Sequence, residues 1–150
     1  MMIGDVHVGH RIVLTTIAFV LAVIFCITLY SLLKPIPEEK RTFPLYFIWL
    51  SLIPDIGYIF QTIIMPFAIP KTLRQAFPNH QEAMLLADKL VKYGIWYIVF
   101  VALGYVVGAF HLHLVTDAVI VAAVFFWTLY WLVAMKFHRN RQRFIDETAG

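Results

Sequence analysis

The chain has 150 residues, of which 61% are hydrophobic and only 14% are charged. A soluble domain averages about 45–50% apolar and about 25% charged residues, so this composition excludes an ordinary water-soluble fold and predicts an integral membrane protein. The net charge of +3 indicates membrane topology and contact with lipid headgroups rather than nucleic-acid binding. A single cysteine, Cys26, excludes an intramolecular disulfide.

Four apolar runs predict an all-α, polytopic membrane protein with one domain, residues 1–150, built as a four-helix bundle. The predicted spans cover about residues 12–33, 45–69, 93–110 and 118–135, each near the ~20 residues that a helix needs to cross a bilayer. The first run is longer than the apolar core of a cleaved signal peptide, so we expect it to be retained.

The second span is interrupted by residues that disturb a helix. Pro54 and Pro66 each lack a backbone donor, and Gly57 lies between them, so this helix should be kinked or locally unwound. The segment Trp49-Leu-Ser-Leu-Ile-Pro54, with a polar residue and a long apolar run after it, resembles part of small bacterial four-span membrane proteins. That resemblance covers the second span alone and implies no activity.

A short amphipathic segment precedes the third span. Asn79-His-Gln-Glu82 has the pattern of a helix start, with Asn79 as N-cap and Glu82 at the third helical position. Residues 81–92 then form either a short cytoplasmic helix lying at the interface or an extension of the third span into water. The second alternative stays open because no helix breaker separates Lys92 from Tyr93.

The basic residues predict the orientation in the membrane. With four complete crossings, the N-terminus, the second loop and the tail share one side and hold nine Lys and Arg, against three on the other side. The positive-inside rule then places both termini in the cytoplasm, and we expect the membrane to be a bacterial inner (plasma) membrane. The basic residues next to that leaflet are predicted to contact lipid headgroups, namely Lys71, Arg74, Lys136, Arg139, Arg141 and Arg143.

Asp55 is the most informative polar residue of the predicted spans. It lies about ten residues into the second span, which is about 15 Å deep, near the bilayer midplane. An ionised carboxylate costs about 2.5–3.5 kcal/mol there, so it needs a structural or functional reason. Asp55 either caps the second half of a broken helix or forms, with Gln61, a site for a proton, a cation or a small solute. A third alternative is a different boundary of the second span, which would bring Asp55 to the membrane interface.

Small residues mark candidate helix-packing faces. Gly104-Tyr-Val-Val-Gly108 is a small-xxx-small pattern in the third span, and Gly57 in the second span also permits close approach of a helix. The contact can be made within one protomer or between two copies.

Reactive or metal-binding groups are sparse. His111, His113 and Asp117 form a weak candidate metal site with too few ligands, and we interpret them as interfacial polar residues. The sequence contains no phosphate-binding loop, zinc-protease motif or nucleophile turn, so we expect no cofactor and do not favour an enzyme.

The leading functional hypothesis is therefore a small accessory, scaffold or assembly subunit that acts through transmembrane helix contacts. The alternative is a small channel or transporter for a proton, cation or small solute that uses Asp55. The expected partners are membrane lipids and other membrane subunits or a second copy of the chain.

Overall fold

The computed structural model describes the backbone of residues 2–54, 56–110 and 113–149, with side chains for residues 12–54, 56–110 and 114–147. Four helical stretches in these ranges are long and apolar enough to cross a membrane, namely Ile12–Leu33, Ile56–Ala76, Gln81–Ala109 and Leu114–Glu147. The chain is thus an all-α integral membrane protein, as its composition predicts. The first, third and fourth stretches belong to the long helices α1 (Met2–Leu33), α5 (Gln81–Ala109) and α6 (His113–Ala149).

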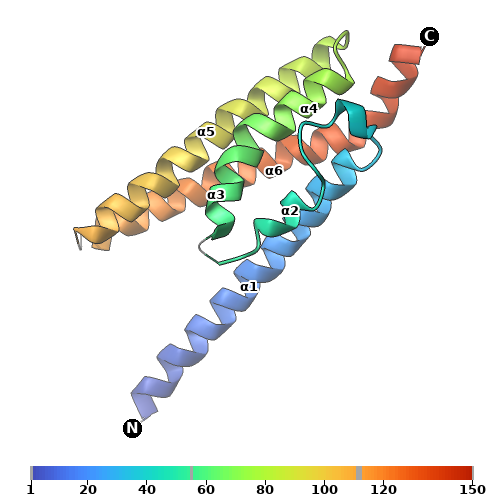
Figure 1. Ribbon diagram of the computed structural model, residues 1–150. Helices are drawn as coiled ribbons and strands as arrows, with labels where there is room; N and C mark the ends of the chain where they lie inside the picture. Colours follow the sequence, from blue (N-terminus) through green and yellow to red (C-terminus); the bar gives the residue numbers. More distant parts are fainter. Residues whose placement is uncertain (1, 55, 111–112, 150) are drawn as a thin grey trace.

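Helices α5 and α6 form a long antiparallel pair (Figure 1). The ring of Phe126 on α6 stacks on Trp96 and Phe100 of α5, with ring centroids 5.9 and 5.5 Å apart. Helix α5 is continuous from Gln81 to Ala109. Residues 81–92 are therefore the first turns of this helix, as in the extension alternative, and do not form a separate amphipathic helix.

The start of α5 differs from the predicted capping box. The N-cap is His80 rather than Asn79, and the Nδ1 atom of its ring accepts a hydrogen bond from the N–H of Ala83 at 3.2 Å. His80 has the extended backbone that an N-cap requires, which moves Glu82 to the second helical position. There Glu82 faces α6 and pairs with Arg143.

The predicted second span is divided into several short elements. The chain forms α2 (Phe47–Leu50), a turn over residues 51–54, α3 (Ile56–Ile63), a wide π-helical segment η2 (Ile64–Ala68) and α4 (Ile69–Ala76). The long helical stretch therefore covers residues 56–76 instead of the predicted 45–69. The interruptions occur at Pro54 and around Pro66, because neither proline has an N–H for a helical hydrogen bond.

The π-helical segment is held by a hydroxyl from another helix. The N–H of Ile69 donates to the carbonyl of Ile64, five residues earlier, but Pro70 has no N–H with which to continue this pattern to Met65. The hydroxyl of Tyr130, which is fully buried on α6, donates to the Met65 carbonyl at 2.8 Å. Tyr130 thus satisfies a backbone acceptor that the local sequence leaves open.

We expect Tyr130→Phe to lower the free energy of unfolding in detergent by about 1 kcal/mol, because the buried Met65 carbonyl loses this donor. Thermal melting of the purified protein measures the effect. The matched control is Tyr46→Phe, since Tyr46 is 61% exposed and its hydroxyl should contribute little. Equal melting temperatures for the two variants would contradict the role assigned to Tyr130.

Two polar contacts bring the ends of several elements together at one end of the molecule. Arg141 near the end of α6 donates to the carbonyl of Ser31 near the end of α1, at 2.9 Å. Thr42, in the loop after α1, donates its N–H to the hydroxyl of Thr72 in α4 at 3.2 Å. Residues 34–76 therefore leave from and return to the same end.

An aromatic cluster of the core lies at this shared end, where the rings of Phe77, Phe137 and Phe144 pack together with centroids 5.3–6.0 Å apart. The N-terminal half of α1 diverges from the other helices (Figure 1), and Ile12 and Leu14 there are 61% and 65% exposed. Figure 1 also places the two chain termini at opposite ends of the molecule. The sequence-based orientation, with both termini on one side, requires them at the same end.

Candidate binding cavity

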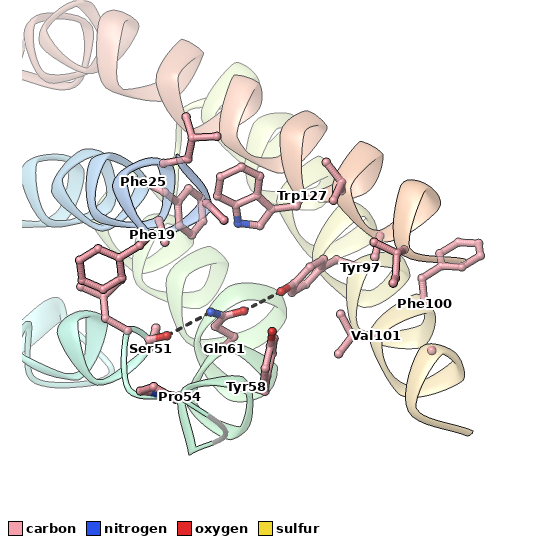
Figure 2. Close-up of a pocket in the computed structure, with 18 of the residues that line it drawn as sticks. Phe19, Phe25, Ser51, Pro54, Tyr58, Gln61, Tyr97, Phe100, Val101 and Trp127 are labelled. Carbon is pink, nitrogen blue, oxygen red and sulfur yellow. Dashed lines mark hydrogen bonds between the residues drawn. The ribbon is translucent and has the colours of Figure 1, made fainter. Parts of the chain in front are cut away.

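A cavity of about 590 Å³ lies between α1, the turn after α2, α3, α5 and α6 (Figure 2). On α1 its lining runs from Ala18 to Cys26, in the middle of the charge-free run of residues 12–33. On α6 the lining runs from Thr116 to Trp127. The cavity is therefore at the depth of the bilayer and not in a headgroup region.

Gln61 of α3 is the polar centre of the cavity. Its Nε2 donates to the carbonyl of Ser51 at 3.2 Å, and its Oε1 accepts a hydrogen bond from the hydroxyl of Tyr97 at 2.7 Å. Figure 2 shows the amide of Gln61 between these two partners. A primary amide has two N–H donors and an oxygen with two lone pairs, so Gln61 can make further hydrogen bonds to a molecule in the cavity.

Gly57 allows the turn to fold back tightly on α3. A Cβ atom at this position would lie 2.3 Å from the carbonyl oxygen of Ser51, far inside van der Waals contact. The absence of a side chain lets the Ser51 backbone approach α3, where its carbonyl meets Gln61. Gly57 and Gln61 are four residues apart, so they share one face of α3.

Aromatic side chains form much of the wall. Phe25 packs on Trp127 with ring centroids 5.0 Å apart, and Tyr58 packs edge-on to Tyr105 at 6.0 Å. At the rim, Phe19 and Tyr105 are 56% and 60% exposed. The cavity is therefore open to the surrounding bilayer.

The polar groups that line the cavity within the described residues are neutral: backbone carbonyls, an amide, the thiol of Cys26 and the hydroxyls of tyrosine, serine and threonine. Such groups bind a partner through hydrogen bonds and not through ionic attraction. The remaining lining is aliphatic and aromatic. The arrangement suits a molecule with an apolar body and one or a few polar atoms.

The candidate ion and metal residues are placed as follows. Gln61 lies in the cavity, whereas Asp55, His111 and the side chain of His113 lie outside the described residues. Asp117 is exposed in the first turns of α6. Among residues whose positions are described, no three His, Cys, Asp or Glu side chains come close enough to hold a metal ion.

The close approach of helices occurs at a glycine that the sequence pattern did not single out. A Cβ atom on Gly94 of α5 would lie 3.0 Å from the backbone of Pro66, so this glycine lets α5 pack against the π-helical segment. Gly104 lines the cavity, and a Cβ atom built on it would lie 3.6 Å from the side chain of Val119. A Cβ atom on Gly108 would meet nothing within 4 Å. Within one protomer no described atom packs on the Gly108 position, so a packing role for Gly108 stays a prediction.

Three of the basic residues predicted to contact lipid headgroups are engaged within the protein. Arg74 pairs with Asp88, Arg143 pairs with Glu82, and Arg141 donates to Ser31. The Nζ of Lys136 is 3.9 Å from the carboxylate of Glu82. An exposed ion pair at this separation contributes little to the stability of the fold. Lys71 and Arg139 are exposed.

Sequence reasoning missed Ser51 and Tyr97 as parts of the polar centre. Ser51 acts through its backbone carbonyl, which carries no signal of residue type. Tyr97 lies near the start of the predicted third span, where tyrosine is common at the membrane interface, but its side chain is only 9% exposed and points into the protein. Comparisons of the chain with protein-family models, curated proteins and solved structures find no match.

Proposed function

We propose that this protein binds a small, largely apolar molecule from the bilayer in the cavity around Gln61, as a membrane carrier or transporter does. The observation that carries this proposal is the combination of an open, aromatic-walled cavity at bilayer depth with one amide at its centre. Ligand sites in proteins have this composition, namely an apolar wall with a few placed polar groups. This proposal belongs to the transport class of function considered from the sequence.

The size of the cavity supports a small ligand over a protein helix. Small-molecule sites typically measure about 300–1,000 Å³, and the value of about 590 Å³ lies within that range. A transmembrane helix of about 20 residues is about 10–12 Å wide and about 30 Å long, so its volume is several times larger. The cavity accommodates one lipid chain or a molecule of similar size.

The test is a pair of matched substitutions on α5. Val101 lines the cavity, whereas Val99, two residues earlier, is 46% exposed and lies outside the lining. We expect Val101→Phe to reduce the amount of lipid or other small molecule that stays bound through purification in mild detergent, because the added ring occupies the cavity. Val99→Phe should retain the wild-type amount.

The measurement is mass spectrometry of the intact protein, with a melting curve to show that both variants are folded. Equal retention by the two folded variants, or no bound molecule in any form, would overturn the proposal. Transport is then tested by the flux of the identified molecule in liposomes that contain wild type or Val101→Phe.

A second candidate function is the accessory subunit, and the N-terminal half of α1 favours it. Ile12, Leu14 and Ile17 are 51–65% exposed on a segment that diverges from the other helices (Figure 1). A helix of another membrane protein could pack on this segment. The test is purification in mild detergent. A partner that copurifies with wild type in fixed stoichiometry and is lost from Leu14→Lys supports this candidate. Purification of both wild type and Leu14→Lys without a partner counts against it.

A further inference from the structure

We infer that residues 34–76 form a re-entrant hairpin, which enters and leaves the bilayer at its cytoplasmic face, so that α1, α5 and α6 alone cross completely. The N-terminus then lies on the opposite side of the membrane from the C-terminus. The first support is the shared end already described, where Arg141 of α6 donates to the carbonyl of Ser31 and Thr42 donates to Thr72 of α4. A complete second crossing would place the end of α4 at the other end of α1.

The depth of the hairpin follows from its contacts with α1. The thiol of Cys26 approaches the carbonyl of Ile48 at 3.5 Å, which places α2 five residues, or about 8 Å, below Ser31 along α1. The turn over residues 51–54 lines the cavity together with Ala18 and Ala22, which lie about 14–20 Å below Ser31. The hydrocarbon core is about 30 Å thick, so the turn lies near its middle.

The backbone of the turn is suited to this depth. The carbonyl of Ser51 accepts from Gln61, that of Ile53 accepts from the N–H of Gly57 at 2.7 Å, and that of Pro54 accepts from Ile56 at 2.7 Å. Irregular backbone is tolerated inside a membrane where its polar groups are satisfied and it lines a cavity. The helical stretch of residues 56–76 also has the lowest mean hydropathy of the four, 1.2 against 1.8–2.9.

The distribution of basic residues indicates the side of the membrane at which the hairpin enters and leaves. With the hairpin re-entrant, the shared end carries eleven of the twelve Lys and Arg, and Arg11 alone lies toward the other end. The same count for four complete crossings is nine against three. The positive-inside rule therefore favours the re-entrant arrangement, with the basic end on the anionic cytoplasmic leaflet.

Single cysteines probed with a membrane-impermeant maleimide test the topology in intact and permeabilised cells. We expect Gly4→Cys and Leu114→Cys to label in intact cells, and Glu39→Cys, Gln75→Cys and Asp146→Cys to label only after permeabilisation. Wild type is the blank, because Cys26 is 2% exposed. Labelling of Glu39→Cys and Gln75→Cys from opposite sides would overturn the hairpin, and a complete reversal of all five would overturn the assigned face.

The depth of the turn needs a separate measurement, because a segment lying flat on the membrane would give the same labelling. A nitroxide on Ile53→Cys, a position that is 41% exposed, should collide more with oxygen, which is enriched in the hydrocarbon core, than with a polar nickel complex in water. The reverse preference would place the turn at the surface and overturn the re-entrant assignment. The outcome does not depend on whether the cavity binds a ligand.

Discussion

We expect Gly57→Ala to lower the free energy of unfolding in detergent by about 2 kcal/mol, the largest loss in an alanine series over the glycines of α3 and α5. The new Cβ would lie 2.3 Å from the carbonyl oxygen of Ser51. Overpacking of this kind costs about 1–3 kcal/mol, and the turn must move away from α3 to relieve it. Because the turn holds one partner of Gln61, the variant should also lose bound ligand.

The other glycines of the series provide graded controls. Gly94→Ala should be destabilised less, because its Cβ would lie 3.0 Å from the backbone of Pro66. Gly104→Ala and Gly108→Ala should melt at or above the wild-type temperature, since their Cβ atoms meet only Val119 at 3.6 Å or nothing, and alanine favours a helix by up to about 1 kcal/mol. A loss of stability at Gly108 equal to that at Gly57 would contradict this account.

The second large effect is expected at Gln61. Gln61→Leu removes the acceptor for the Tyr97 hydroxyl and the donor for the Ser51 carbonyl, so two polar groups at bilayer depth lose their partner. We expect a loss of about 1–2 kcal/mol in detergent, together with weaker retention of the molecule bound in the cavity. Thermal melting and mass spectrometry of the purified variants measure the two effects.

A double-mutant cycle separates the hydrogen bond from the shape of the side chain. Combining Gln61→Leu with Tyr97→Phe should cost less than the sum of the two single changes, because the hydroxyl that would be left unpaired is also removed. Thr62→Val is the neighbouring control, since the Thr62 hydroxyl is exposed and donates to the Tyr58 carbonyl of its own helix. Additive effects of Gln61 and Tyr97 would show that the two side chains do not act together.

The sequence alone determined the all-α membrane class, because 61% hydrophobic residues in long charge-free runs have no other stable environment. It also indicated where the second predicted span is interrupted, since Pro54 and Pro66 lack N–H groups wherever they occur. The first turns of α5 were correctly assigned to helix because their pattern is local, although the N-cap moved by one residue, from Asn79 to His80.

The tertiary structure alone decided the depth in the membrane at which each residue lies and the partner that its side chain contacts. Hydropathy measures how apolar a segment is but not the direction in which it runs, so the return of residues 34–76 to the end of α1 follows from contacts such as Thr42 with Thr72. In the same way, Tyr97 could serve equally at an interface or in the interior. The hydrogen bond from the Tyr97 hydroxyl to Gln61 places Tyr97 in the interior. Such a bond between residues 36 apart in sequence depends on how α3 packs against α5.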